Sequence, residues 1–272
     1  MLTSPVFRFV EYPFIHSLPY KYHNYSPNTT YRYYKSDEDI EGRKDDMSYR
    51  LNNYLFRSDD FSKDDSSNNF LFAGCSQTVV LGLPLELGWA HQVNSAFEKD
   101  KYFNISAVGL SIDTVISNVV HYIEMFGNPK AILILFPDHF RITHVVDKEI
   151  ITKWYQPYGS DEHTDIIDEA NLKNYMSLKN LELICDSRGI PLLYSSWQQE
   201  TSDVFMELKK QGVLKHAFDI YENVDIDLSK YSKKNSKYPH YWSVARDGIH
   251  FGEQRNNFFA DSFINKLKEL GL

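Results

Sequence analysis

The sequence predicts an α/β fold in which a parallel sheet of about five strands is covered by helices on both faces. Short apolar runs alternate along the chain with longer segments whose apolar residues recur at helical spacing. Strands that alternate with helices imply right-handed crossovers between parallel strands, which make a doubly wound sandwich. One apolar run, AILILF at 131–136, is continuous, as is typical of a strand buried on both faces.

The predicted elements begin at Phe70. The spacing predicts strands over 70–73, 103–108, 131–136, 190–194 and 217–220. It predicts helices over 86–100, 112–126, 168–187, 201–210 and 252–270. The strongest helical stripe is that of 112–126, where apolar residues fill positions 112, 115, 116, 119, 120 and 123. Gly127 follows at the position of a helix stop.

Three parts of the chain lie outside this alternation. One of them, residues 225–242, precedes the closing helix and is a candidate wall or lid over a site at the sheet edge. Residues 1–68 are rich in Tyr, Asn, Ser and Asp and have poor apolar periodicity, so we expect an N-terminal arm packed on a main domain of residues 69–272. Residues 138–167 form an insert between the third strand and the next helix, and this insert carries Trp154 and Tyr155. We expect the insert to form one wall of a site at the sheet edge.

Composition excludes several classes of function. The net charge is −8 and no long basic block is present, which argues against a nucleic-acid partner. No stretch has the length and apolarity of a membrane helix, and no secretion signal is evident, so we expect a cytoplasmic protein. The two cysteines, Cys75 and Cys185, are too few for a disulfide framework, and no metal-ligand spacing appears. We therefore expect neither a metal nor another cofactor, and the oligomeric state stays open.

The chemistry-bearing residues lie at the two ends of the predicted main domain. The first strand is followed by Gly-Cys-Ser-Gln-Thr, which includes Ser76, and sites in such folds lie at the carboxyl ends of the strands. A serine nucleophile needs a base and a group that orients the base. Asp247 and His250, three positions apart just before the closing helix, supply both types of group. The alternatives are that Ser76 is a turn residue, that Cys75 is the nucleophile, and that His250 is a surface histidine.

Three blocks in the same order resemble the SGNH (GDSL-type) hydrolase family. They are Gly-Cys-Ser-x-Thr after the first strand, NISAVGLSID after the second, and Asp-x-x-His before the last helix, together spanning about 200 residues from Phe70 to Leu270. The resemblance implies a flavodoxin-like sandwich and ester hydrolysis. It also implies that Ser76 is the nucleophile, His250 the base and Asp247 its orienter, with the N–H groups of Ser76 and Gly109 in the oxyanion hole. YRLNNYLFRSDDF is similar to an Asn-x-x-Gly-Phe-Arg stretch of the family, with Leu55 in place of its Gly.

The chain departs from the family pattern at two places. Cys75 stands where the better-known motif has Asp, and LFPDHFR stands where the family has Gly-x-Asn-Asp after the third strand. Asp138 therefore falls on the position of an oxyanion-donating Asn, although a carboxylate donates only when protonated. We expect Asp138 to point out of the hole, with His139 or Arg141 as a replacement donor, or a hole of backbone donors alone.

The expected substrate is a small acyl ester, and an acetylated carbohydrate is the best single choice. Aromatic residues of the insert can stack on a sugar, and the resemblance implies removal of acetyl groups. Asp138, His139, Arg141, Trp154 and Tyr155 are the residues we expect to contact the substrate. Two alternatives remain: an O-acyltransferase that uses the same triad, and a catalytically silent binding or structural protein on this fold. A short-chain nitrophenyl ester assay separates the last of these from the others.

Overall fold

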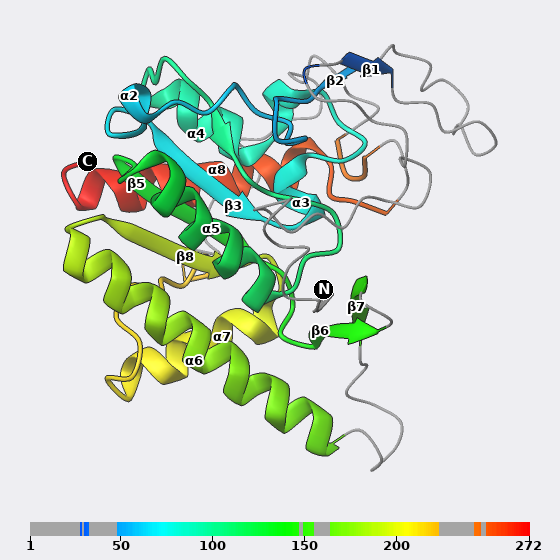
Figure 1. Ribbon diagram of the computed structural model, residues 1–272, viewed down its shortest axis with the longest axis vertical. Helices are drawn as coiled ribbons and strands as arrows, with labels where there is room; N and C mark the ends of the chain where they lie inside the picture. Colours follow the sequence, from blue (N-terminus) through cyan, green and yellow to red (C-terminus); the bar gives the residue numbers. More distant parts are fainter. Residues whose placement is uncertain are drawn as a thin grey trace, which may run out of the picture.

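The structure of the chain, a computed structural model, confirms the α/β class (Figure 1). It describes residues 28, 30–32, 48–146, 149–154, 164–222, 242–245 and 249–272. The main sheet has four parallel strands, in the order β4-β3-β5-β8. Their bounds are β3 Phe70–Gly74, β4 Phe103–Asn104, β5 Ala131–Phe136 and β8 Leu192–Ser196.

Helices cover both faces of this sheet (Figure 1). The helices and turns of the described main domain are α3 Ser76–Val79, a 3₁₀ turn η2 at Leu85–Leu87, α4 Trp89–Ala96, α5 Ile112–Phe126, α6 Thr164–Arg188, α7 Gln199–Lys210 and α8 Glu253–Glu269. α4 and α8 pack on one face, and α5, α6 and α7 pack on the other. Before them come α2 Lys63–Ser66 and a small antiparallel pair, β1 Thr30–Arg32 and β2 Ser48–Arg50.

Alternation along each strand explains why both faces are apolar. In β3, Phe70 and Phe72 face the core under α4 and α8, whereas Leu71 and Ala73 face the core under α5 and α6. Successive side chains of a strand point to opposite faces, so a strand covered on both sides needs an unbroken apolar run. All six residues of β5 are buried for this reason.

The strand order reverses at β3. In chain order the strands run second, first, third and fourth across the sheet, which is the flavodoxin-like order. The chain leaves β3 toward β4 on one side and later returns to β5 on the other side. In folds of this kind ligands bind outside the carboxyl ends of the strands, where the strand order reverses. The segments after β3 and β5 therefore flank the expected position of a site.

Two predicted strands are shorter than expected. The fifth strand, 217–220, is reduced to a single parallel bridge between Tyr194 and Ala217. The second covers only Phe103–Asn104, and just beyond it the side-chain Oδ1 of Asn104 accepts the N–H of Ser106 at 2.9 Å. The described sheet therefore has four strands, where the spacing predicts about five.

The predicted helix over 86–100 is divided into η2 and α4 by Gly88. This glycine is extended, with φ −73° and ψ 139°, and a Cβ on it would lie 2.1 Å from a methyl carbon of Val80. The other predicted elements are present with shifted ends: α5 and β5 agree with the prediction, α6 begins four residues earlier than the predicted 168, and β8 begins two residues later than the predicted 190.

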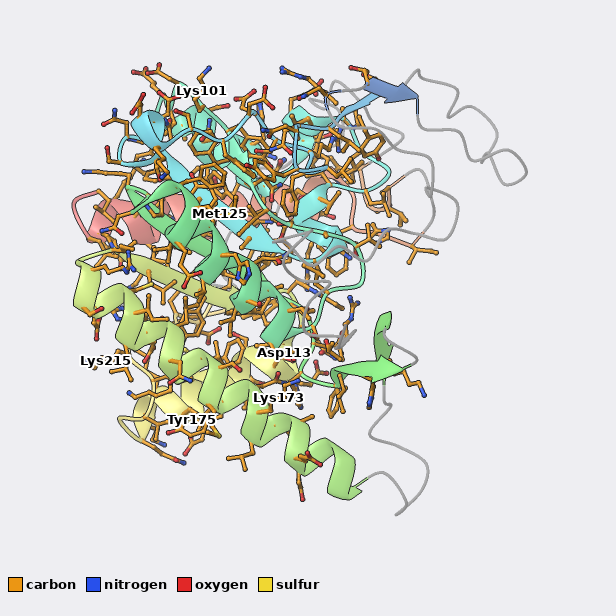
Figure 2. All side chains as sticks on the ribbon, in the orientation of Figure 1. Lys101, Asp113, Met125, Lys173, Tyr175 and Lys215 are labelled. Atoms are coloured by element: carbon orange, nitrogen blue, oxygen red, sulfur yellow. The ribbon has the colours of Figure 1, made fainter. Side chains whose placement is uncertain are left out.

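The insert after β5 contains a β-hairpin that sequence reasoning missed. β6 Arg141–Val146 pairs antiparallel with β7 Glu149–Trp154, and Arg141 is opposite Trp154 in the register. The hairpin is tied to the helices through Asp113 at the start of α5. Thr143 Oγ1 donates to Asp113 Oδ1 at 3.3 Å, and Lys173 of α6 forms an ion pair with Asp113 Oδ2 at 2.5 Å (Figure 2). These contacts hold the hairpin at the carboxyl edge of the sheet.

Candidate active site

Ser76 lies on a tight turn directly after β3. It is the first residue of α3 and is buried, with 5% of its surface exposed. The turn requires Gly74, because a Cβ there would lie 2.3 Å from Thr78 Oγ1 and 2.6 Å from the Leu135 carbonyl oxygen. The sequence Gly-Cys-Ser therefore bends the chain sharply between β3 and α3. Cys75, the alternative nucleophile, is fully buried.

His250 lies on a short extended segment directly before α8. Val244 and Phe251 form an antiparallel bridge, and the Ala245 N–H donates to the His250 carbonyl at 2.9 Å. Gly252 caps the N-terminus of α8 and donates its N–H to the Ser243 carbonyl at 3.1 Å. His250 itself is half-buried. Asp247, the expected orienter of His250, lies outside the described residues.

A side-chain hydrogen bond joins the Ser76 turn to the His250 segment. Gln77 Oε1 accepts the backbone N–H of Phe251 at 3.2 Å, although the two residues are 174 positions apart in the sequence. α8 is tied to the same region, because Asn256 Oδ1 accepts the N–H of Trp89 at 3.1 Å. Trp89 in turn donates its indole N–H to Thr78 Oγ1 at 3.3 Å. The structure thus brings together the segments that carry Ser76 and His250. The Ser-His-Asp triad itself stays a prediction.

Two residues of the predicted arm brace the loop after α3. The guanidinium of Arg57 donates to the carbonyls of Val79, Val80 and Leu83 at 3.2, 2.8 and 3.1 Å. It also lies over the ring of Tyr49, 4.0 Å from its centroid, and the Tyr49 hydroxyl accepts the N–H of Gly82 at 2.7 Å. Burial lowers the pKa of Arg57, yet three carbonyl acceptors stabilise its charge.

Arg57 comes from a turn built by Asn52. The side-chain Oδ1 of Asn52 accepts the N–H groups of Tyr54 and Phe56 at 2.9 and 3.0 Å. Leu55, which stands where the family stretch has Gly, has a φ of 66°. This is the left-handed region that favours glycine, so the similarity to Asn-x-x-Gly-Phe-Arg extends to the backbone conformation at this position.

Gly109 lies in a turn after β4, with a φ of 75°. Asn104, the last residue of β4, donates from Nδ2 to the Thr78 carbonyl at 3.0 Å, which joins the end of β4 to α3. Both segments belong to neighbouring strands, β3 and β4, and leave the sheet at the same edge. The role of Gly109 in an oxyanion hole stays a prediction.

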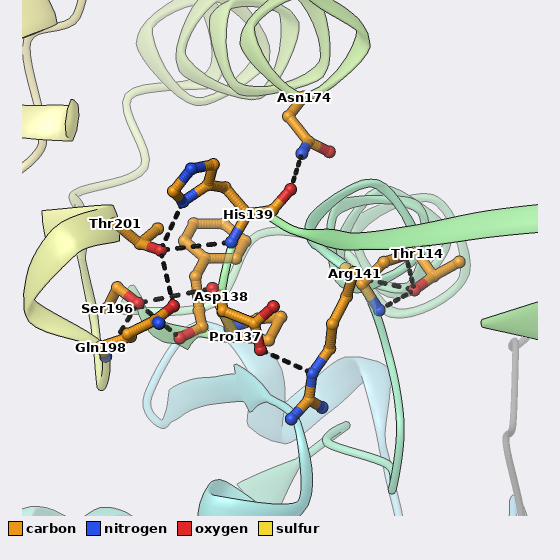
Figure 3. Close-up of polar contacts among 11 residues, drawn as sticks. Thr114, Pro137, Asp138, His139, Arg141, Asn174, Ser196, Gln198 and Thr201 are labelled. Atoms are coloured by element: carbon orange, nitrogen blue, oxygen red, sulfur yellow. Dashed lines mark hydrogen bonds and ion pairs between the residues drawn. The ribbon is translucent and has the colours of Figure 1, made fainter. Parts of the chain in front are cut away.

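Asp138 is buried and paired with Arg141 just beyond the end of β5 (Figure 3). Arg141 Nε donates to Asp138 Oδ2 at 2.8 Å. The bond occupies one oxygen of the carboxylate and uses the Nε–H of Arg141, which we named as a candidate replacement donor. Burial raises the pKa of Asp138, and the neighbouring Arg141 opposes that shift. The other carboxyl oxygen, Oδ1, is buried and has no hydrogen-bond partner among the described residues.

His139 is held by α6 and α7 (Figure 3). Its Nδ1 lies 2.8 Å from Thr201 Oγ1, its backbone N–H donates to the same oxygen at 3.2 Å, and its carbonyl accepts from Asn174 Nδ2 at 3.4 Å. Burial lowers the pKa of the imidazole, which favours its neutral form. These contacts orient Nδ1 toward Thr201, so only Nε2 is left for the oxyanion role that we predicted.

A row of ring contacts joins the Asp138 pair to the His250 segment. The guanidinium carbon of Arg141 lies 5.7 Å from the centroid of the Trp197 ring. Trp197 in turn contacts the ring of Phe251, with 5.7 Å between centroids and 73° between planes. Phe251 follows His250 directly. The predicted substrate residues Asp138 and Arg141 therefore belong to the same region as His250.

Of the two aromatic residues of the insert predicted to contact the substrate, the structure describes the backbone of one, Trp154. The backbone of Trp154 ends β7 opposite Arg141, which brings the end of the hairpin to the Arg141 region. Tyr155 lies outside the described residues. Stacking of either residue on a substrate stays a prediction.

No cluster of three or more metal-ligating side chains occurs within the described ranges. No described helix has both the length and the apolarity needed to cross a membrane. Cys185, the second cysteine, is buried against the sheet, and burial raises the pKa of its thiol to about 12.

Comparisons with known proteins give structural likenesses only. No protein-family model and no curated protein matches the chain. Fifteen solved chains match the structure. One is TesA, with 15% identity and a TM-score of 0.47 over 74% of this chain and 99% of TesA.

Two further solved structures are similar over nearly the same share of the chain. A member of the lipolytic protein G-D-S-L family from Veillonella parvula has 12% identity and a TM-score of 0.45, with 74% of this chain and 98% of that one covered. The psychrotrophic esterase EstA from Pseudoalteromonas has 14% identity and a TM-score of 0.43, with coverages of 75% and 98%. The fold assignment rests on the strand order β4-β3-β5-β8 of the sheet.

Sequence reasoning missed three residues that organise the site: Arg57, Gln77 and Trp197. Gln77 lies inside the Gly-Cys-Ser-Gln-Thr block, but nothing in the spacing indicated its partner. Arg57 lies in the Asn-x-x-Leu-Phe-Arg stretch, whose resemblance to the family pattern indicated this residue but did not predict its contacts. Trp197 directly follows β8, and the rule that sites lie at the carboxyl ends of strands could have found it.

Proposed function

We propose that the chain is a serine esterase in which Ser76 is the nucleophile, His250 the general base and Asp247 the group that orients His250. The observation that carries the proposal is the hydrogen bond from the Phe251 N–H to Gln77 Oε1, at 3.2 Å. It joins the residue after Ser76 to the residue after His250. The order of the three sequence blocks and the position of Ser76 after β3 support the same assignment.

The proposed reaction has two steps. Ser76 Oγ attacks the acyl carbonyl carbon while His250 accepts the hydroxyl proton, and the backbone N–H groups of Ser76 and Gly109 stabilise the charge on the carbonyl oxygen. His250 then gives that proton to the departing alcohol oxygen, which leaves an acyl-serine. Water attacks the acyl-serine and gives one proton to His250, and the carboxylic acid leaves as Ser76 Oγ regains its proton.

The proposed acyl group is acetyl, and the proposed alcohol is a carbohydrate. The acetyl assignment rests on the resemblance to the SGNH hydrolases, because no described residue reads the acyl group. Since Asp138 replaces the family asparagine and is bound by Arg141, backbone N–H groups carry the oxyanion in this proposal.

The experiment is to treat the protein with a fluorophosphonate probe and to assay a short-chain nitrophenyl ester. Ser76→Ala should abolish labelling and lower kcat by about three orders of magnitude or more. Cys75→Ala should keep most activity, since its thiol is buried in the turn. Ser95→Ala is the matched control, because Ser95 is an exposed serine on α4.

Loss of labelling with Cys75→Ala but not with Ser76→Ala would show that the nucleophile is misassigned. Absence of both labelling and ester turnover in the wild-type protein would favour the silent binding protein.

A further inference from the structure

Two buried polar atoms near the proposed site have no hydrogen-bond partner in the part of the chain that the structure describes. One is Asp138 Oδ1, an acceptor, on a side chain that is 1% exposed. The other is Trp197 Nε1, a donor. Leaving such a group unpaired in a protein interior costs about 1–3 kcal/mol, so unpaired groups are uncommon and concentrate where a ligand or a water completes them.

Arg141 connects the two unpaired atoms. Its Nε bonds the other oxygen of Asp138 at 2.8 Å, and its guanidinium lies over the ring of Trp197. The Nε contact leaves the terminal Nη1 and Nη2 groups for other partners. The Arg141 side chain is 20% exposed, whereas that of Asp138 is almost fully covered. Of these two side chains Arg141 is the one exposed to solvent, so in this inference a ligand meets Arg141 first and displaces it partly to reach the covered atoms.

The chemistry of the three residues selects a hydroxyl group. The carboxylate of Asp138 and the guanidinium of Arg141 offset each other's charge, so the cluster does not call for a charged ligand. Asp138 Oδ1 requires a donor, and Trp197 Nε1 and the Arg141 Nη groups require acceptors. A hydroxyl is both donor and acceptor, whereas a carboxylate ligand has acceptors only and would be repelled by Asp138.

We propose that Asp138, Arg141 and Trp197 form a subsite for hydroxyl groups of a neutral polyhydroxylated alcohol, such as a sugar, that carries the ester. The inference rests on the proposed esterase function and names the alcohol side of its substrate. The ring of Trp197 contacts Phe251, which follows His250, so an alcohol bound here adjoins the segment that carries the proposed base. Neither the sequence blocks nor the likenesses to solved structures point to Trp197.

Binding is tested without turnover by following the indole N–H signals of ¹⁵N-labelled protein in NMR spectra. The Trp197 signal is the one that disappears in Trp197→Phe. It should move in a saturable way when methyl glucoside is added, and it should not move with tetrahydropyran, which has the ring but no hydroxyl groups. A signal that stays fixed up to the solubility limit of the glycoside, or that moves with acetate instead, overturns the subsite.

The contribution of the subsite to turnover is tested by a ratio, kcat/KM for a monoacetylated methyl glucoside divided by kcat/KM for ethyl acetate. The ratio should fall roughly 3- to 10-fold in Trp197→Phe, which keeps an aromatic ring and removes the donor, mainly through a higher KM for the sugar ester. Trp242→Phe is the matched control, because Trp242 is also half-buried beside the His250 segment. A ratio unchanged in Trp197→Phe contradicts the proposal.

The two proposals fail in different ways. If the probe does not label Ser76 and neither ester is hydrolysed, the esterase assignment fails, and the NMR titration still decides whether the hydroxyl subsite exists. If Trp197→Phe hydrolyses each ester as efficiently as the wild-type protein does, the esterase assignment is supported and the subsite is contradicted.

Discussion

Gln77 shows how one residue connects two distant blocks of the sequence. It lies directly after Ser76, and its side-chain oxygen holds the N–H of Phe251, directly after His250. Productive catalysis requires the nucleophile and the base to stay within hydrogen-bond reach of each other. The Gln77 contact lies one residue away from both the proposed nucleophile and the proposed base, so it constrains the segments that carry them.

Gln77→Leu should lower kcat/KM for a nitrophenyl ester about 10- to 100-fold, because small displacements of reacting groups are costly. Gln77→Glu is the conservative variant, since its carboxylate still accepts the Phe251 N–H, and it should restore most of the loss. Hydrogen exchange measured by NMR should be faster at the Phe251 amide in Gln77→Leu than in Gln77→Glu. Equal exchange in the two variants would show that Gln77 does not position this segment.

The turn between β3 and α3 depends on close approach at Gly74. The position faces Thr78 on one side and the carbonyl of Leu135 in β5 on the other, and a Cβ added to Gly74 would lie closer to both than real contacts allow. The turn is therefore shaped by the neighbouring strand as well as by its own residues. This explains why a glycine precedes Cys75 and Ser76 in the first block.

Gly74→Ala should destabilise the fold by about 1–3 kcal/mol through overpacking and should also reduce ester turnover by moving Ser76. Gly127→Ala is the matched control at the end of α5. Gly127 has a φ of 85° and nothing within 4 Å of an added Cβ. The variant should therefore lose about 1–2 kcal/mol of unfolding free energy through backbone strain alone and keep its esterase activity. Urea unfolding and the nitrophenyl assay measure both effects. Full activity in Gly74→Ala would contradict this account of the turn.

At the scale of the whole molecule, residues before β3 contribute directly to the site region. Arg57 supplies its guanidinium to three carbonyls of the loop after α3. Ser58 adds a further contact, because its hydroxyl donates to the Tyr102 carbonyl at 2.9 Å. The segment from Tyr49 to Asp59 is thus a structural part of the proposed catalytic unit.

Arg57→Met should lower the free energy of unfolding by on the order of 3 kcal/mol, since it removes charge-assisted hydrogen bonds and leaves buried carbonyls unpaired. Arg57→Lys should recover only part of this loss, because an ammonium cannot reproduce the planar fork. Arg50→Met is the control on the same segment. Its ion pair with Asp60, at 3.9 Å, is exposed, so the change should cost less than about 1 kcal/mol. Equal losses for Arg57→Met and Arg50→Met in urea unfolding would contradict the bracing role.

The sequence by itself determined the α/β class, the positions of β3, α5 and β5, and the order of the three blocks. These features follow from local periodicity: a strand covered on both faces must be apolar throughout, and a helix against a sheet must carry an apolar stripe. The Gly-Cys-Ser turn was also predictable, because its chemistry lies within five consecutive residues.

Only the tertiary structure decided which residues meet. The contacts of Gln77 with Phe251, of Arg57 with the α3 loop, and of Arg141 with Trp197 join elements that the chain separates. It also decided that the fifth strand is a single bridge at Ala217 and that β4 covers only Phe103–Asn104. The three side-chain contacts depend on which distant group each side chain meets, and no local pattern of residues records that choice.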